Sequence, residues 1–154
     1  MKRKFGWLLA GAIVGVVAVG PWQSSSEAGT GPATIRINDR VLASTRIDVG
    51  AHGTSAGDSE VIRSVLVQRG TRDTIGRGEL VCTFVDSVRA RVCRGTYILP
   101  KGEIVVGGSM LYQQFYDLAV LGGTGLYDNA RGTMTVTRTA RKPVRNMIVF
   151  RLVG

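Results

Sequence analysis

The sequence predicts an all-β fold of eight antiparallel strands, closed into a barrel or packed as a sandwich. Eight runs of β-forming residues follow residue 30, separated by Gly, Asp and Pro, and no amphipathic helix of useful length appears among them. The connections are too short for parallel crossovers, which need about a dozen or more residues. Successive strands are therefore expected to be antiparallel neighbours, and an eight-stranded up-and-down barrel is the architecture that such even spacing favours.

The predicted strands can be placed in order along the chain. The first is followed by a glycine-rich segment from Val49 to Asp58, for which we expect a loop, and later turns include Pro100-Lys101-Gly102. Residues 29–58 then form an irregular N-terminal segment with the first strand, and residues 59–154 form the barrel. The predicted strands cover residues 33–39, 59–68, 74–86, 89–99, 102–111, 115–121, 132–139 and 146–153.

The last run favours a barrel that associates with copies of itself. Residues 146–153, NMIVFRLV, are apolar on both alternating faces. The outside of a free barrel is expected to be polar, so a strand that is apolar on both faces needs cover from a second layer. A partner subunit is the simplest cover.

The N-terminus has the pattern of an export signal. Lys2, Arg3 and Lys4 precede an uncharged stretch over residues 5–20, which Pro21 ends. Sixteen apolar residues are short for a bilayer crossing of about 20 residues, but they suit the core of a signal peptide. We expect a signal peptide over residues 1–28, with cleavage after Ala28, or alternatively an uncleaved anchor. In both cases the domain would be secreted or extracytoplasmic, with membrane contact only through this segment.

The charge and the rare residues exclude several classes of function. The formal net charge is +9, and removing residues 1–28 leaves 17 basic and 10 acidic side chains. The basic residues are scattered, without the interleaved aromatics or the module of a nucleic-acid-binding protein, so no nucleic-acid partner is expected. A single His52 and two cysteines cannot form a Cys/His zinc site, and no metal is expected. Neither a P-loop nor a G-x-S-x-G motif occurs.

The two cysteines lie in consecutive β-rich runs. If those runs form a hairpin that turns near Ser87 and Val88, Cys82 and Cys93 lie opposite each other. A cross-strand disulfide is then possible in an oxidising compartment. The alternative is a free thiol that lines a pocket.

Residues 118–132, LAVLGGTGLYDNARG, resemble the allene oxide cyclase-like barrel superfamily, which includes the plant dirigent proteins. In that superfamily a G-G-[TS]-G turn precedes an aromatic residue and then A-R-G or A-Y-G. Weaker matches in the same order are Ile75-Gly76 before Cys82, and Lys101-Gly102-Glu103-Ile104 with Gly108. The resemblance extends over residues 59–154.

The resemblance implies an eight-stranded barrel, usually trimeric, around an apolar pocket, which acts without a cofactor. We therefore expect a secreted barrel that binds a lipophilic small molecule and steers its cyclisation or isomerisation. The alternative is a non-catalytic dirigent-like or ligand-binding barrel of the cell envelope. Buried polar groups with perturbed pKa values in the pocket favour an enzyme, an apolar lining favours a binder, and a filled barrel favours a structural role.

The resemblance also suggests site residues. Arg131, the arginine of A-R-G, is expected at the pocket floor, paired with Asp117, and its alternative is a structural ion pair. Asn38 matches an asparagine of the plant cyclases, although Arg36 stands where they carry a glutamate. Arg131, Asp117 and Asn38 are thus the candidate catalytic residues.

Further candidates are the aromatic side chains and the glycines around the motif. Tyr112, Phe115, Tyr116 and Tyr127 can line a lipophilic pocket, with core or interface packing as the alternative. Gly122, Gly123 and Gly125 are predicted structural turn residues. Asp58 is interpreted as a turn carboxylate that caps backbone amides.

Overall fold

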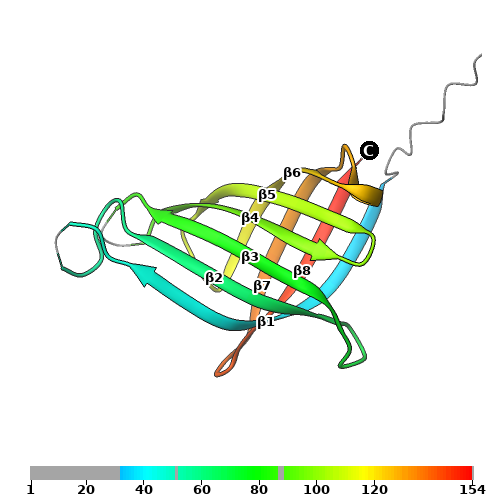
Figure 1. Cartoon of the computed structure of the whole chain (residues 1–154), viewed down its shortest axis with the longest axis horizontal. Helices are drawn as coiled ribbons and strands as arrows, with labels where there is room; N and C mark the ends of the chain where they lie inside the picture. The colour runs from blue at the N-terminus through cyan, green and yellow to red at the C-terminus, as the bar shows by residue number, and fades with distance from the viewer. Residues whose placement is uncertain (1–31, 51, 87–88, 154) are drawn as a thin grey trace, which may run out of the picture.

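The computed structural model describes residues 32–50, 52–86 and 89–153, and within them eight strands close into a barrel (Figure 1). Each strand pairs antiparallel with the next, and β1 also pairs with β8, which confirms the predicted up-and-down barrel. Only a short 3-10 helix, η1, interrupts the strands in this part of the chain. The elements are β1 (Ala33–Ile47), β2 (Ser59–Gln68), β3 (Thr74–Phe84), β4 (Arg91–Leu99), β5 (Gly102–Met110), β6 (Phe115–Gly123), η1 (Gly125–Tyr127), β7 (Arg131–Arg141) and β8 (Val144–Val153).

The first strand is longer than the run that predicted it. Instead of ending at Asp39, β1 continues to Ile47, where it still pairs with Ser59 of β2. Its register shifts between Val41 and Ala43, and this irregularity breaks the alternation of apolar and polar residues. The sequence pattern is therefore lost where the strand continues.

Alternating side chains fill one half of the barrel. The buried cluster includes Leu99, Ile104, Val120, Phe150 and Leu152, which belong to the last parts of β4, β6 and β8 and the start of β5, and so lie towards the end of the barrel where β8 finishes. The other end carries the β1–β2, β3–β4, β5–β6 and β7–β8 connections (Figure 1). The filled half gives the barrel its core, and the second end is available for a site.

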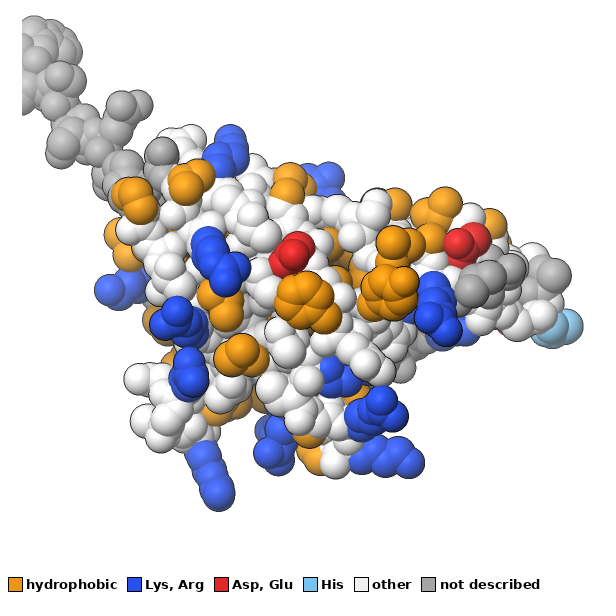
Figure 2. Space-filling model, turned by 180° about the vertical axis from the view of Figure 1, so that it is seen from behind, with side chains coloured by type: hydrophobic (Ala, Val, Ile, Leu, Met, Phe, Trp, Pro, Cys, Tyr) orange, Lys and Arg blue, Asp and Glu red, His pale blue; other side chains and the backbone are white. Residues whose placement is uncertain are grey.

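The outer face of β8 is partly covered by the chain itself. Val149 is 8% exposed and Met147 is half-buried, whereas Arg145, Arg151 and Val153 are exposed. The neighbouring strands β1 and β7 flank Val149, so this residue does not require a partner subunit for its burial. The structure thereby removes the argument that this strand alone demands association. Lys and Arg side chains are spread over the face of the molecule shown in Figure 2, as their scattered positions in the sequence predicted.

Cys82 and Cys93 form the predicted disulfide. The two residues are direct partners in the β3–β4 register, and both side chains are buried in the barrel. The free pocket thiol is therefore excluded for both cysteines. Ser87 and Val88, where the hairpin was predicted to turn, lie outside the described residues, as does the predicted signal peptide over residues 1–28. In the residues that the structure covers, no helix is long and apolar enough to cross a membrane.

Candidate functional site

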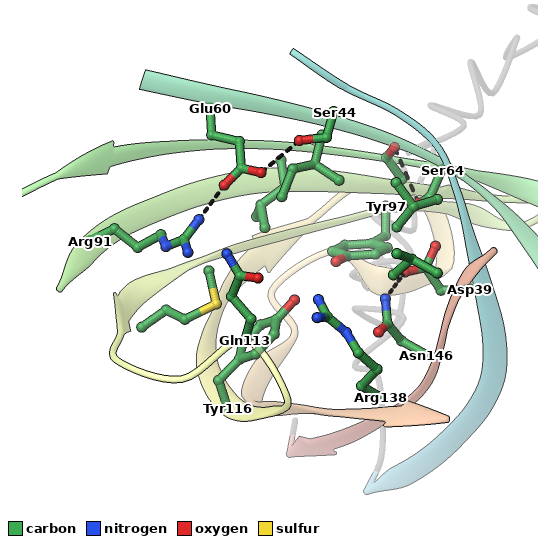
Figure 3. A pocket seen from close by; sticks show the side chains of 16 residues that line it. Asp39, Ser44, Glu60, Ser64, Arg91, Tyr97, Gln113, Tyr116, Arg138 and Asn146 are labelled. Carbon is green, nitrogen blue, oxygen red and sulfur yellow. Dashed lines mark hydrogen bonds and ion pairs between the residues drawn. The ribbon is translucent and has the colours of Figure 1, made fainter. Parts of the chain in front are cut away.

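A cavity of about 200 Å³ occupies the half of the barrel that the core leaves open (Figure 3). Its lining combines apolar side chains with charged and hydrogen-bonding ones, and these come from all eight strands and the β5–β6 connection. The lining residues are Asp39, Val41, Ser44, Glu60, Ile62, Ser64, Gly78, Leu80, Arg91, Tyr97, Met110, Gln113, Tyr116, Arg138, Val144 and Asn146.

Strand irregularities lie next to this cavity. The register of β1 shifts between Val41 and Ala43, and the register of β7 shifts between Arg138 and Ala140. Such bulges redirect the side chains that follow them. Val41 and Ser44 can therefore both line the cavity, although a strict two-residue period would not place them there together. Arg138 precedes the shift in β7 and continues the inward alternation of Met134 and Val136.

Asp39 is the carboxyl group buried deepest in the cavity wall. It is 6% exposed, and Asn146 Nδ2 donates a hydrogen bond to its Oδ2 at 2.7 Å. Asn146 is also the cross-strand partner of Asp39 on β8. Burial raises the pKa of Asp39 above its ordinary value, although hydrogen bonds from Ser64 and Asn146 oppose this effect. A carboxyl with a raised pKa can exchange a proton at pH values where surface aspartates are fully ionised.

Two tyrosines, Tyr97 and Tyr116, line the same cavity as Asp39 (Figure 3). Burial raises the pKa of Tyr97 well above its ordinary value, and burial together with the charge of Asp39 also raises the pKa of Tyr116. Both phenols therefore stay protonated and can donate hydrogen bonds. Tyr97 also packs edge-to-face on Phe150, with ring centroids 5.4 Å apart, which fixes it against the core.

A second polar chain lines the mouth of the cavity. Ser44 Oγ donates to Glu60 Oε1 at 2.6 Å, and Glu60 Oε2 forms an ion pair with Arg91, which is 5% exposed. With its oxygen towards Arg91, the Gln113 carboxamide accepts a hydrogen bond from Arg91 Nη1 at 3.3 Å. The Arg91 guanidinium also lies 4.6 Å from the centre of the Phe84 ring. These contacts hold Arg91 in place and neutralise its charge.

Four buried polar atoms of the cavity have no hydrogen-bond partner among the described residues. They are Asp39 Oδ1, Asn146 Oδ1, Arg91 Nε and Arg138 Nε. All four residues line the same cavity. Leaving a buried donor or acceptor unpaired costs about 1–3 kcal/mol each, and such atoms are rare in folded proteins. Their concentration here is typical of a site that binds a polar ligand.

Outside the cavity, an open groove of about 610 Å³ runs along the β5–β6 connection. Tyr112 and Phe115, two of the predicted ligand-binding residues, lie in this groove and are 61% and 57% exposed. Arg91, Gln113 and Arg138 line both the groove and the cavity, so the two spaces adjoin each other. The two aromatic residues thus lie at the entrance and not in the barrel interior.

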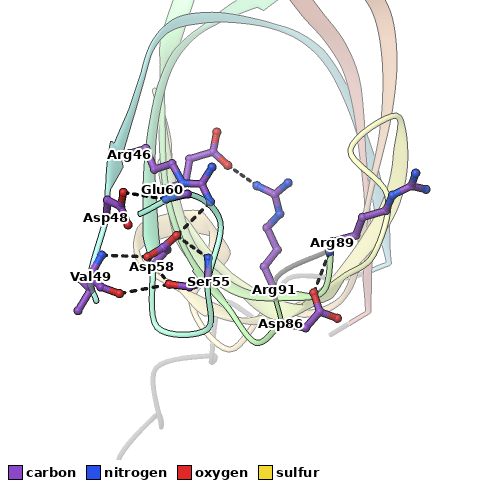
Figure 4. A network of polar contacts seen from close by, with 10 residues as sticks. Arg46, Asp48, Val49, Ser55, Asp58, Glu60, Asp86, Arg89 and Arg91 are labelled. Atoms are coloured by element: carbon purple, nitrogen blue, oxygen red, sulfur yellow. Dashed lines mark hydrogen bonds and ion pairs between the residues drawn. The ribbon is translucent and has the colours of Figure 1, made fainter. Parts of the chain in front are cut away.

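The β1–β2 loop is organised around Asp58, as the interpretation of a capping turn carboxylate predicted (Figure 4). Asp58 is fully buried and accepts hydrogen bonds from the backbone N–H groups of Val49 and Ser55, both at 2.9 Å. Arg46 adds an ion pair at 3.1 Å. The pKa of Asp58 is lowered to about 2, mainly by the backbone hydrogen bond from Val49 and next by the one from Ser55. Asp58 therefore orders the rim of the barrel and does not line the cavity.

The candidate catalytic residues suggested by the resemblance do not line the cavity. Arg131 is exposed at the start of β7, and its Nη1 donates to the backbone oxygen of Ala130 at 2.9 Å. Asp117 is also exposed, and no ion pair joins it to Arg131 in the described structure. The predicted placement of this pair at the pocket floor is therefore wrong. Asn38 is half-buried between Ile37 and Asp39, which point into the barrel, so its side chain is on the outer face.

The remaining predicted residues lie at the filled end. Tyr127 belongs to η1 and packs in the core instead of lining the cavity. Gly122 and Gly123 are the last residues of β6, and Gly125, with φ of 60°, begins η1. A Cβ on Gly123 would approach the Glu103 oxygen to 2.3 Å, and one on Gly125 would approach the Lys101 oxygen to 2.5 Å. The glycines thus allow close contact between η1 and the β4–β5 turn.

Sequence reasoning missed Asp39, Arg138 and Asn146, whereas Tyr116 was among the aromatic residues predicted to line a pocket and does line the cavity. A signal existed for Asp39, because it continues the inward alternation of Ile35 and Ile37. Asn146 begins the final apolar run in a corresponding way, two residues before Ile148. Arg138 had the same signal, since it continues the alternation of Met134 and Val136, but it belonged to a cluster of basic residues that looked solvent-exposed.

Comparison with known proteins supports the barrel at the level of fold. No protein-family model matches the sequence, and no curated protein is significantly similar to it. Among solved structures, the one titled pyocyanin demethylase is 23% identical, with a TM-score of 0.68, and the match covers 79% of this chain and 100% of that one. The Diels-Alderase AbmU from Streptomyces koyangensis is 17% identical, with a TM-score of 0.64 and coverage of 80% and 70%.

The structure of a dirigent protein is also similar to that of this chain. The pterocarpan synthase dirigent protein PsPTS1 is 12% identical, with a TM-score of 0.61, and the match covers 82% of this chain and 99% of that one. The described structure therefore has the eight-stranded barrel fold of the dirigent proteins and their cyclase-like relatives, as the sequence resemblance indicated.

Proposed function

We propose that this barrel binds a small organic molecule, part apolar and part polar, in the cavity between Asp39 and Tyr116, and steers its isomerisation or cyclisation without a cofactor. The observation that carries the proposal is the set of unpartnered buried polar atoms around the cavity, which is also lined by apolar side chains such as Ile62, Leu80 and Met110. A filled barrel would have favoured a structural role, and an apolar lining would have favoured a passive binder.

In this proposal Asp39 is the proton-transferring group. Its Oδ1 is the unpaired carboxylate oxygen, and Asn146 holds the other oxygen. Asp39 removes a proton from the bound molecule and returns it to a different atom, while Tyr97 and Tyr116 donate hydrogen bonds to the oxygen on which negative charge develops. The apolar wall holds the reacting molecule in one conformer, which alone can supply several of the roughly 7–11 kcal/mol available from ideal orientation.

The structural neighbours support this class of function. Their names describe a demethylase of pyocyanin, a Diels-Alderase and a pterocarpan synthase dirigent protein, all of which act on small organic molecules. Two of the three names describe ring-forming or ring-assembling chemistry. None of them defines the substrate of this chain, so the proposal goes no further than the chemistry of the cavity.

We extend the proposal to location and assembly. A secreted or extracytoplasmic location is supported by the basic and apolar pattern of residues 2–20 and by a disulfide, since disulfides persist in oxidising compartments. A trimer is supported by the resemblance, and by exposed apolar side chains on the outer faces of β3, β4 and β6, including Val81, Val92 and Leu121. The mass of the native assembly tests the trimer.

The proton-transfer step can be tested with 2-tetralone, a bicyclic ketone that enolises. In D2O, a base removes the α-proton and a deuteron returns to the same carbon, so NMR measures the rate of exchange. We expect the wild-type protein to accelerate exchange and Asp39→Asn to lower the catalysed rate about 100-fold or more, because the amide cannot act as a base. Asp117→Asn, on the outer face, is the matched control and should exchange like the wild type.

Two results would count against the proposal in different ways. If Asp39→Asn exchanges as fast as the wild type, Asp39 is not the base. If the wild type binds 2-tetralone, as shown by a shift in protein NMR signals of the cavity residues, but does not accelerate its exchange, the chain is a non-catalytic ligand-binding barrel.

A further inference from the structure

Arg138 is the cation that the cavity does not neutralise. It lies on β7 at the register shift, and its backbone N–H donates to the Gln114 oxygen at 2.8 Å. The close view shows its guanidinium directed into the cavity, between Tyr116 and Asn146 (Figure 3). Its Nε is buried without a hydrogen-bond partner, and no acid of the described residues forms an ion pair with it. Arg138 thus presents a positive charge and a free donor to whatever enters the cavity.

Two other arginines near this end of the barrel, Arg91 and Arg46, are paired. Glu60 neutralises Arg91, and Asp58 neutralises Arg46 (Figure 4). A partly buried guanidinium without an anion is costly, and arginine binds carboxylates and similar oxyanions through parallel N–H donors. Of these three arginines, Arg138 alone has this capacity unused.

Asp39 does not serve as the counter-ion of Arg138. The Oδ2 atom of Asp39 accepts a hydrogen bond from Asn146. Asn146 on β8 is the cross-strand partner of Asp39 on β1 and of Arg138 on β7, so it lies between the carboxylate and the guanidinium. Burial is the main influence on the pKa of Tyr116, and among the smaller influences the charge of Arg138 lowers it. The field of Arg138 therefore acts on the Tyr116 side of the cavity.

The groove at the entrance of the cavity also combines positive charge with apolar surface. The groove beside the cavity is lined by Arg89, Arg91 and Arg138 together with the exposed aromatic rings of Tyr112 and Phe115. Basic side chains at a cleft raise the local concentration of anions, and aromatic rings offer an apolar surface to a flat molecule. An anionic, lipophilic molecule fits both features.

We propose that the substrate of this barrel is an organic anion, whose carboxylate or ionised hydroxyl binds Arg138 next to Tyr116 while its apolar body faces Ile62 and Leu80. The inference rests on the proposed function, because it assigns the substrate class of the same cavity. It makes Arg138 the residue that selects charge, whereas Asp39, on the far side of Asn146, meets the reacting part of the molecule.

The probes are 2-naphthoate and 2-naphthamide, which have the same ring system and differ in charge. Titration followed by fluorescence gives the Kd of each. We expect the wild type to bind 2-naphthoate at least tenfold more tightly than 2-naphthamide. Arg138→Gln should remove this preference and leave the affinity for 2-naphthamide within about twofold, and Arg138→Lys should keep part of the preference. Arg141→Gln, which removes an exposed arginine from the same strand, is the control and should bind like the wild type.

Several outcomes would overturn the inference. A wild type that binds the two probes equally, or an Arg138→Gln variant that keeps the preference, rejects Arg138 as the anion-binding residue. Loss of preference in Arg141→Gln would mean that the general positive charge selects the anion. If the wild type binds 2-naphthamide without any preference for 2-naphthoate, the proposed cavity stands and only the substrate class is wrong. Failure to bind either probe counts against the cavity itself.

Discussion

Asp39 and Asn38 differ by one position in the sequence, but only Asp39 lines the cavity, whereas the side chain of Asn38 is on the outer face of the barrel. The two residues are adjacent, but in a strand their side chains point to opposite sides of the sheet. The resemblance favoured Asn38, and the structure places Asp39 in the cavity. The alternation of Ile35 and Ile37 already contained this information, but which face of a strand points inward is certain only when the barrel closes.

The two arginines Arg131 and Arg138 differ in a similar way, since only Arg138 lines the cavity. Arg131 is prominent in the sequence because of its motif, but it lies outside the barrel and bonds to the neighbouring backbone. Arg138 is in a region rich in basic residues, but it continues the inward alternation of Met134 and Val136 on β7 and so lines the cavity. The alternation therefore marked Arg138 as inward-facing, whereas the basic residues around it favoured a solvent-exposed interpretation.

The buried carboxyl groups should affect stability in opposite ways as the pH changes. The pKa of Asp39 is raised, so the folded protein binds its proton more tightly than the unfolded chain does, and its ionisation lowers stability as the pH rises above 3.8. Asp39→Asn should therefore unfold at a higher urea concentration than the wild type at pH 7, with no such gain at pH 3.5. Urea titrations at the two pH values, followed by circular dichroism, measure this difference.

Asp58 provides the opposite sign for comparison. Its pKa is lowered to about 2, so it contributes stability that is present above pH 3.8 and is lost as the pH falls through about 2. Asp58→Asn should therefore be less stable than the wild type at pH 7. If Asp39→Asn is destabilised at pH 7 in the same way, the carboxylate of Asp39 has a structural role and its proposed burial cost is wrong.

At the level of elements, the strands were predictable because glycine, proline and aspartate mark the turns between them. The β2 strand has the same bounds as its sequence run, and β5 and β8 differ from theirs by only a residue or two. The error in β1 has a physical cause, since the bulge between Val41 and Ala43 interrupts the alternation from which a strand is recognised. The pairing of Cys82 with Cys93 followed from the hairpin between two such strands.

The disulfide between β3 and β4 should contribute measurably to stability. Mass spectrometry of the protein produced in an oxidising compartment and alkylated without reduction should show no modified cysteine. The double variant Cys82→Ala/Cys93→Ala should lose no more than about 3 kcal/mol in free energy of unfolding, because the closed loop is short in the chain-entropy model. Reduction should not lower the stability of that variant further. Two alkylated cysteines before reduction would show that the bond is absent from the protein.

At the scale of the whole molecule, the two ends of the barrel have different roles. The filled end carries the apolar core that holds the strands together, and the open end carries the polar atoms that the fold itself does not satisfy. The site is assembled from all eight strands and a connection, so its members are distant in sequence and share no motif. The fold could be predicted from local patterns for this reason, whereas the site depended on the closure of β1 onto β8.

This division predicts that the cavity can be filled without loss of the fold. Ile62 and Val61 are neighbours on β2, but Ile62 lines the cavity, whereas Val61 lies on the outer face. Ile62→Trp should abolish binding of 2-naphthamide, because the indole occupies the space that the ring system needs, and Val61→Trp should bind it like the wild type. Overpacking can cost about 1–3 kcal/mol, so thermal unfolding should show that Ile62→Trp is still folded before its affinity is interpreted. Equal affinity in the two variants would mean that the probe binds elsewhere, for example in the groove beside Phe115, and that the open end of the barrel is not the binding site.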